Sequence, residues 1–206
     1  MYVEYCNYNK YIESYEQELK TVFKAIDKGI QGFALPIHMI REIREYIPDT
    51  IVLAAPIDYP SGYSSTKVRN HMVLNSVQSG ANAIDYVPNQ YLLRSKFTEL
   101  KDEIKTVLNI CNDYGATLRI FLDYRYSGII SIAKQYVAMG IDIGFCTIGY
   151  HHDDFYDNLI NCKLLSSKTG MSTIFNGYIW TNEQIQLVKQ AKTFGIRLYN
   201  VDFWCI

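Results

Sequence analysis

The sequence predicts an α/β fold in which eight strands alternate with helices and close into a (β/α)8 barrel. The first observation is a repeated order, in which a glycine ends a helix-like stretch and a short β-rich segment follows. Glycine adopts the left-handed conformation that ends helices at no steric cost. The second observation is that most of these β-rich segments are apolar on both faces, as strands buried on both sides must be. The glycines that follow this order are Gly80, Gly115, Gly140, Gly170 and Gly195.

The expected strands are short and rich in β-branched residues. In chain order they are Tyr2–Cys6, Phe33–Pro36, Thr50–Ile57, Asn82–Val87, Thr117–Asp123, Ile141–Thr147, Met171–Asn176 and Ile196–Asp202. Helices are expected between them, and the longest are Ile12–Asp27 and Phe97–Asn112. In the second of these helices, Leu100, Ile104 and Val107 share one face at helical spacing, which is typical of a helix that packs on a core.

Eight strands with intervening helices favour a closed (β/α)8 TIM barrel, which we expect to form a single domain over residues 1–206. An open doubly wound sheet is the alternative, but the sequence has no glycine-rich phosphate turn of the dinucleotide-binding type. Only Phe203–Ile206 follow the last expected strand, so the barrel is expected to lack its final helix. We therefore expect an uncovered apolar flank between the first and last strands, through which the chain forms a homo-oligomer or binds a protein partner.

Composition excludes several classes of function. The formal net charge of −1 gives no basic surface for nucleic acid, and no apolar run is long enough to span a membrane. The N-terminus lacks the features of a secretory signal. The five cysteines are scattered and odd in number, which indicates reduced thiols. We expect a cytoplasmic protein that binds neither nucleic acid nor a membrane.

Polar residues mark the carboxyl ends of the expected strands, where the chemistry of such barrels takes place. They are Glu4, His38, Asp58, Asp85, Asn89, Asp123, Arg125, Thr147, Tyr150, Asn176, Tyr178 and Asp202. The mouth of the barrel, meaning these strand ends, is therefore expected to be polar and acidic. One interpretation gathers the four aspartates of this set into a pocket for a cation or a polyhydroxy ligand, where mutual repulsion would raise some of their pKa values. Scatter of some of them over the surface is the alternative.

Two further features have a functional and a structural interpretation. The run His151–Asp154 contains metal-binding residue types, but neighbours in sequence rarely point at one ion, and a loop that leads into a helix is the preferred interpretation. Cys146 could act as a nucleophile, but no histidine is placed by sequence to activate it, so a buried thiol is expected. We expect no metal and no other cofactor.

A resemblance to a known family rests on motifs that occur in a fixed order. The segment Ala81–Asn89 resembles the fourth-strand motif of the deoxyribose-phosphate aldolase family. The other matches are Ile57–Gly62 to the turn after strand three, Thr66–Arg69 to the following helix start, Ile141–Gly149 to the strand-six motif, and Phe175–Ile179 to the stretch after strand seven. The resemblance covers the chain from about Gly32 to Ile179. It implies a class I aldolase barrel that cleaves a deoxy sugar phosphate through a lysine Schiff base.

The same resemblance implies roles for individual residues, and the two lysines of the family are missing. Phe145 occupies the position of the imine-forming lysine and Ile174 that of the lysine that tunes it, and neither side chain can form an imine. Asp85 matches the family's proton-relay aspartate, and Asn89 matches the polar residue near it. Asp85 is either a retained acid/base group or a buried aspartate that hydrogen-bonds to its neighbours.

The family binds the substrate phosphate after strands seven and eight. Gly177 keeps one of the glycines expected there, and Asn176 precedes it. Asp202 stands at the end of the eighth expected strand, where its carboxylate would repel a phosphate.

The hypothesis from the sequence is a barrel of this kind that has lost Schiff-base catalysis and acts as a non-catalytic binding or assembly protein with a small sugar-like ligand. The residues assigned to binding are Asp58, Thr147, Asn176, Gly177 and Asp202. The alternative is a carbon–carbon lyase with altered catalytic residues, in which Asp85 is the acid/base group and Asn89 and Asp123 assist it. A third interpretation is a misaligned sixth strand and a surviving aldolase.

Overall fold

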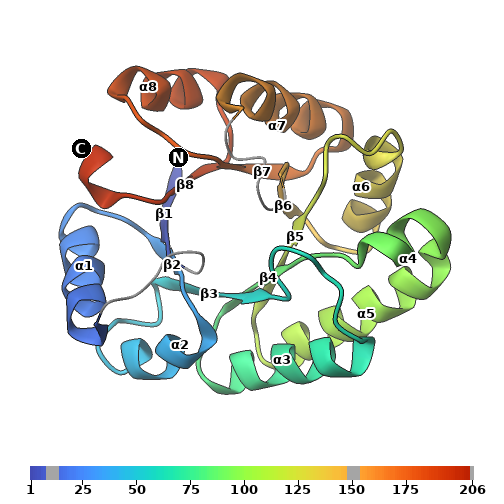
Figure 1. The fold of residues 1–206 in the computed structure, drawn as a ribbon, viewed down its shortest axis with the longest axis horizontal. Helices are drawn as coiled ribbons and strands as arrows, with labels where there is room; N and C mark the ends of the chain where they lie inside the picture. Colours follow the sequence, from blue (N-terminus) through green and yellow to red (C-terminus); the bar gives the residue numbers. More distant parts are fainter. Residues whose placement is uncertain (8–13, 148–153, 205–206) are drawn as a thin grey trace.

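Eight parallel strands form a closed barrel in the computed structural model, which describes residues 1–7, 14–147 and 154–204. Each strand pairs with the next one along the chain, and β8 pairs with β1 to close the barrel (Figure 1). The strands are β1 (Tyr2–Cys6), β2 (Gly32–Ala34), β3 (Val52–Ile57), β4 (Ala83–Tyr86), β5 (Thr117–Phe121), β6 (Ile143–Phe145), β7 (Ser172–Asn176) and β8 (Gly195–Leu198). The predicted (β/α)8 TIM barrel is confirmed.

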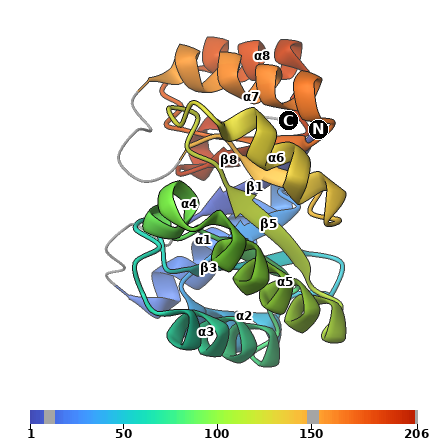
Figure 2. The ribbon, with the colours of Figure 1, turned by 90° about the vertical axis from the view of Figure 1, so that its right-hand side faces the viewer.

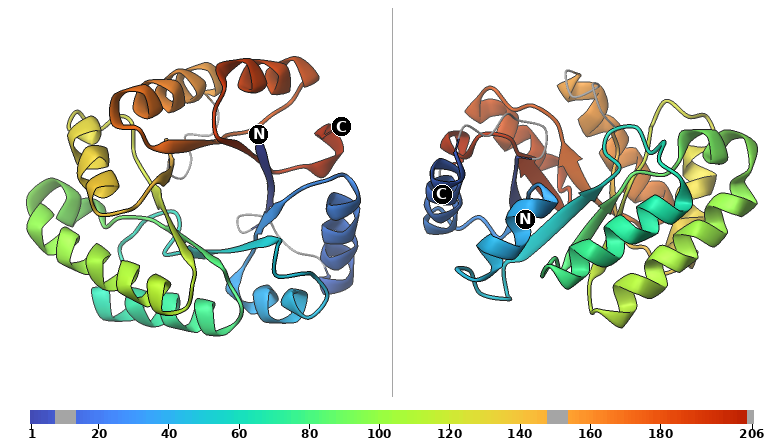
Figure 3. Two further views of the ribbon diagram at one scale, coloured as in Figure 1. Left: turned by 180° about the vertical axis from the view of Figure 1, so that it is seen from behind. Right: turned by 60° about the horizontal axis from the view of Figure 1, so that its bottom comes forward.

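Helices surround the barrel as an outer ring (Figures 1 and 2). They are α1 (Tyr15–Asp27), α2 (Ile37–Arg44), α3 (Thr66–Gln78), α4 (Gln90–Ser95), α5 (Phe97–Asp113), α6 (Ile129–Ala138), α7 (Phe155–Thr169) and α8 (Asn182–Ala191). Helix α5 buries Leu100, Ile104 and Val107, as their spacing predicts, and packs against α3 (Figure 3). None of the described helices is long and apolar enough to cross a bilayer.

Glycine ends most of the predicted helices in the expected conformation. Gly80, Gly115, Gly140 and Gly170 all have positive φ angles between 66° and 99°. Gly195 is different, because it lies inside β8 and has no positive φ. A Cβ atom there would lie 2.9 Å from the ring of Tyr2 on the adjacent strand β1. At this position the missing side chain makes room for a neighbouring residue rather than for a turn.

The barrel has no α-helix after β8 within the described residues, in agreement with the prediction. A 3-10 helix, η1 (Val201–Phe203), follows instead and lies next to α1 (Figure 1). Lys24 Nζ of α1 donates to Asp202 Oδ1 at 2.6 Å. Trp204 is only 9% exposed. The predicted uncovered apolar flank is therefore wrong for the described residues, because α1 and η1 pack over the space that a final helix would fill.

Candidate functional site

Four charged side chains from four strands meet inside the barrel. Glu4 on β1, Asp85 on β4, Arg119 on β5 and Arg197 on β8 are each at most 2% exposed, and we call them the charge quartet. Strand register brings them together, because Glu4 is the pairing partner of Arg197 and Asp85 is that of Arg119. Alternate residues of a strand face the same side, so the residues between them point toward the helices.

Each arginine of the charge quartet bridges both carboxylates. Arg119 donates from Nε to Asp85 Oδ1 at 2.6 Å and from Nη1 to Glu4 Oε2 at 2.7 Å. Arg197 donates from Nε to Glu4 Oε1 at 2.5 Å and from Nη2 to Asp85 Oδ2 at 2.5 Å. The two negative and two positive charges cancel, so the centre of the barrel is buried, charged and neutral overall.

The electrostatic environment keeps the charge quartet ionised. Burial opposes ionisation of Glu4, but Arg119 and Arg197 outweigh it and hold the pKa of Glu4 below its ordinary value. Burial likewise opposes the cation of Arg119, and Asp85 and Glu4 overcome that effect and raise its pKa. The hydroxyl of Tyr2 donates to Glu4 Oε2 at 2.9 Å, and burial, followed by the charge of Glu4, raises the pKa of Tyr2. The expected acidic mouth is thus replaced by a neutral ion-pair network.

An apolar cluster fills the space next to the charge quartet. Its members, all fully buried, are Val87, Phe121, Phe145 and Ile174. The rings of Phe121 and Phe145 stack with centroids 4.6 Å apart. The guanidinium carbon of Arg197 lies 4.1 Å from the Phe145 centroid, and that of Arg119 lies 5.2 Å from it. Two cations therefore contact the face of Phe145, an arrangement that an aromatic ring stabilises and a lysine would not.

The positions of the two absent lysines belong to this apolar cluster. Phe145 is fully buried and paired with Ile174 across β6 and β7, which confirms the predicted burial of Phe145. Every lysine of the described residues lies on a helix, at a helix end or in a loop, and none lies on a strand. Lys10 lies outside the described residues. The part of the barrel wall that the structure describes therefore offers no amine to an electrophile.

Two of the predicted aspartates bond to partners close to them in the chain. Asp58 accepts hydrogen bonds from the backbone N–H and the hydroxyl of Ser64, at 2.7 and 2.8 Å. Asp123 is 6% exposed and pairs with Arg125, whose Nε and Nη2 lie 2.8 and 2.7 Å from its two oxygens. Both residues stabilise loops at the ends of their strands.

The predicted pocket of four aspartates does not form. Asp85 bonds to the buried arginines, and Asp58 and Asp123 bond within their own loops. Asp202 is 63% exposed and pairs with Lys24, whose hydrogen bond and charge lower the pKa of Asp202. This is the opposite of the rise that mutual repulsion would produce, so the predicted pKa shift is wrong for Asp202. Strand β8 ends at Leu198, four positions before Asp202, which places that carboxylate on the outer surface.

The remaining predicted residues lie on the side of β4 and on the side of β6 and β7. Asn89 caps α4, since its Oδ1 accepts the backbone N–H groups of Tyr91 and Leu92 at 3.0 Å. Thr147 follows β6 and is 1% exposed. Gly177 follows β7, where a Cβ atom would lie 3.0 Å from the amide nitrogen of Asn158.

Asn176 at the end of β7 is fully buried and holds its neighbours together. Its backbone oxygen accepts from Asn158 Nδ2, and its Oδ1 accepts from the hydroxyl of Tyr199, both at 2.7 Å. Its Nδ2 is buried without a hydrogen-bond partner, and Asn7 Oδ1, just after β1, is buried in the same condition. One unused donor and one unused acceptor therefore lie in the described residues at the mouth. Buried polar groups of this kind normally bind a protein group, water or ligand.

The metal interpretation finds no support in the described residues. Asp154 caps α7 by accepting the backbone N–H of Asp157 at 3.0 Å, as expected for a loop that leads into a helix. Tyr150, His151, His152 and Asp153 lie outside the described residues. The described parts of the chain hold no group of three His, Cys, Asp or Glu side chains that suits a metal ion.

Cys146 is buried beside Cys162, as expected for a structural thiol. Burial, followed by the contact with Cys162, raises the pKa of Cys146 well above its ordinary value. The thiolate that a nucleophile needs is therefore disfavoured.

Sequence reasoning missed Arg119, Arg197 and Tyr199 as members of the site. A signal for the arginines was present, because each stands alone as a charged residue in an otherwise apolar strand, in the same way as Glu4 and Asp85. Charges in buried strands need partners. Their mutual proximity depends on the closure of β8 onto β1, which the local sequence does not encode.

Comparison with known proteins places this geometry among the aldolases. A deoxyribose-phosphate aldolase of Metamycoplasma hominis is 26% identical over 182 residues, which cover 79% of this chain and 83% of that protein. One of Streptococcus pyogenes is 26% identical over 81 residues, or 39% of this chain and 36% of that protein. The solved tetrameric structure of the deoxyribose phosphate aldolase from Aeropyrum pernix superimposes with a TM-score of 0.83 at 18% identity and covers 98% and 87% of the two chains. No protein-family model matches the chain.

These comparisons confirm the resemblance to deoxyribose-phosphate aldolases. The streptococcal match spans little more than a third of that relative's length, whereas the match to the Metamycoplasma protein spans most of it. The likeness to the solved structure supports the barrel fold. The chain thus has aldolase-like sequence relatives and an aldolase-like class I TIM barrel, with an apolar cluster at the lysine positions.

Proposed function

We propose that this chain is a deoxyribose-phosphate-aldolase-like barrel without Schiff-base catalysis, and that it acts as a non-catalytic, cytoplasmic binding or assembly protein. The observation that carries the proposal is Phe145. It is fully buried at the sequence position of the imine-forming lysine, stacked on Phe121 and in contact with both arginines of the charge quartet. An imine requires an unprotonated amine at this place, and a phenyl ring supplies none.

The environment of Asp85 also favours a non-catalytic role. A general base needs a substrate proton within about 2.6–3.2 Å and a pKa near the working pH. Asp85 is fully buried, and its two oxygens accept hydrogen bonds from Arg119 and Arg197. These bonds use the carboxylate for structure, so the alternative of a lyase with Asp85 as acid/base group is the less supported one.

The ligand of the proposed binding function is a small, uncharged sugar-like molecule. The support for this class is the pair of buried amide groups without hydrogen-bond partners, Asn176 Nδ2 as a donor and Asn7 Oδ1 as an acceptor. A hydroxyl group both donates and accepts, so a polyol suits such a pair. The described cations nearest to these groups are already neutralised within the charge quartet, which disfavours a phosphorylated ligand.

The ligand class is tested by titration of 2-deoxyribose and of its 5-phosphate, with saturation-transfer NMR as the readout. We expect the uncharged sugar to bind and the phosphate to bind more weakly. Asn176→Ala removes one hydrogen-bonding group and is expected to weaken binding about fivefold, which corresponds to about 1 kcal/mol. Asn75→Ala, at an exposed asparagine of α3, is the matched control and should leave binding unchanged. Equal binding by the Asn176→Ala variant would contradict the assignment, provided that its melting curve shows it folded.

The loss of catalysis is tested by a retro-aldol assay on 2-deoxyribose 5-phosphate. We expect no release of acetaldehyde above the rate without protein, because no described amine reaches the barrel interior. Turnover that disappears in an Asp85→Asn variant would instead support the lyase with altered catalytic residues. Turnover that survives this substitution would contradict both interpretations.

A further inference from the structure

An exposed apolar ridge runs along the outer face of α7. Tyr156, Ile160 and Leu164 are 64%, 62% and 44% exposed, and they follow each other at intervals of four residues. Residues four apart lie on one face of a helix. The opposite face packs on the barrel through Phe155, Cys162 and other buried residues. The ridge therefore has no partner among the described residues, and single helices of soluble proteins rarely present three such side chains in a row.

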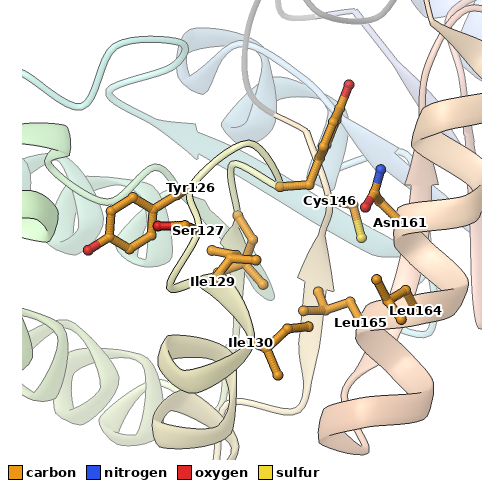
Figure 4. Close-up of a pocket in the computed structure, with 10 residues that line it drawn as sticks. Tyr126, Ser127, Ile129, Ile130, Cys146, Asn161, Leu164 and Leu165 are labelled. Carbon is orange, nitrogen blue, oxygen red and sulfur yellow. The ribbon is translucent and has the colours of Figure 1, made fainter.

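A cavity of about 210 Å³ lies between α6 and α7 and adjoins this ridge (Figure 4). Leu164 belongs both to the ridge and to the wall of the cavity. The other walls are mostly apolar and include Tyr126, Ile129, Ile130 and Leu165. The same face of the molecule thus carries a protruding apolar ridge and an apolar hollow, the combination that a self-complementary interface needs.

The charges that flank the ridge are also self-complementary. If two copies of α7 pack antiparallel with Ile160 at the centre, positions equally far from Ile160 face each other. Tyr156 of one copy then lies opposite Leu164 of the other, at the edge of the cavity. Asp157 lies opposite Lys163 in the same register, and both are exposed. A parallel arrangement would place like charges together, so the sequence of α7 favours the antiparallel one.

We propose that the α7 face is a homodimer interface, in which a second copy of this chain packs antiparallel on α7 and seats Tyr156 at the partner's cavity. A buried aromatic side chain removes about 200 Å² from water, so the three ridge residues supply roughly 300 Å² per copy. A stable interface buries about 800 Å² per partner. The ridge and its surroundings lie at the lower end of this range, so the dimer is weak and concentration-dependent.

Sedimentation velocity over about 5–500 µM tests the proposal, a range chosen for a small interface. We expect a monomer that converts into a dimer as the concentration rises. Ile160→Asp places two carboxylates at the two-fold axis and is expected to raise the dimer dissociation constant more than tenfold. Val68→Asp is the matched control, since Val68 is 49% exposed on α3, and it should leave the constant unchanged. A wild-type monomer at every concentration would overturn the proposal, as would a dimer that Ile160→Asp leaves intact.

A charge exchange tests the register. Asp157→Lys alone and Lys163→Asp alone each bring like charges together in the homodimer and should weaken it. An equimolar mixture of these two single variants should restore association, because in the mixed dimer each carboxylate faces an amine. Residues six apart on one helix do not face each other, so restoration cannot arise within one copy. Failure of the mixture to associate better than either variant would contradict the antiparallel register.

Discussion

Replacement of Arg197 by methionine is expected to lower the free energy of unfolding by about 3–5 kcal/mol, the cost of leaving buried charges unpaired. Arg197 donates to both Glu4 and Asp85, and all three side chains are fully buried. The variant leaves one oxygen of each carboxylate without its partner in a region closed to water. Urea denaturation of the wild type and of Arg197→Met measures the difference.

Two controls separate this effect from loss of charge in general. Lys24→Met breaks the exposed pair with Asp202 and should cost no more than about 1 kcal/mol. The double variant Glu4→Gln/Arg197→Met removes a carboxylate together with the arginine, so its destabilisation should be smaller than the sum for the two single variants. Additive losses would mean that Glu4 and Arg197 are not energetically coupled, which the 2.5 Å contact between them excludes.

The pH dependence of stability follows from the lowered pKa of Glu4. A carboxyl group whose folded pKa lies below its unfolded value contributes stability above the unfolded value, which is about 4.3 for glutamate. That contribution is lost as the pH falls through the folded pKa. In Arg197→Met the folded pKa of Glu4 rises, so less of this stability remains at neutral pH. Urea midpoints between about pH 3 and pH 7 should therefore differ between wild type and variant most at the upper end of this range.

Replacement of Phe145 by lysine is expected to be nearly as damaging, with a loss of about 3–5 kcal/mol in unfolding free energy. The substitution removes the stacking on Phe121 and introduces an ammonium group beside the guanidinium groups of Arg119 and Arg197. Restoration of the family's lysine by a single change therefore costs the fold more than it can contribute to chemistry. Differential scanning fluorimetry and urea titration both report the effect.

The matched control for this substitution is Phe23→Lys in α1, where the phenyl group is 40% exposed and a lysine can reach solvent. We expect a change below about 1 kcal/mol there. Phe145→Leu keeps an apolar side chain and should lie between the two lysine variants. A Phe145→Lys protein that unfolds at the same urea concentration as wild type would show that the site tolerates a buried amine.

The architecture was readable from the sequence because its signals are local. Positive-φ glycines such as Gly170 end helices, and apolar segments such as Ile143–Phe145 follow them as strands. The end of the last strand was misplaced for an equally local reason. Asn200 accepts the backbone N–H of Asp202 and begins η1, although Val201 and its neighbours resemble a continuing strand. Short turns of this kind compete closely with extended structure, and packing against α1 decides between them.

The site was only partly readable, because its chemistry depends on contacts between distant strands. The replacement of the lysine by Phe145 could be recognised from the motif, and so could the burial that follows from it. The partners of Asp85 could not, since Arg197 lies 112 positions away and reaches Asp85 only after β8 closes onto β1. The covering of Trp204 by α1 and η1 is another contact that only the folded chain defines.

Borohydride trapping with intact-mass spectrometry tests the loss of Schiff-base chemistry most directly. The protein is incubated with 2-deoxyribose 5-phosphate and reduced, with a deoxyribose-phosphate aldolase treated in parallel as a positive control. Reduction converts any imine into a stable secondary amine, so an aldolase gains mass at its lysine. We expect this chain to keep its unmodified mass while the control gains an adduct. An adduct that peptide mapping assigns to a lysine of this chain, Lys10 included, would contradict the proposal.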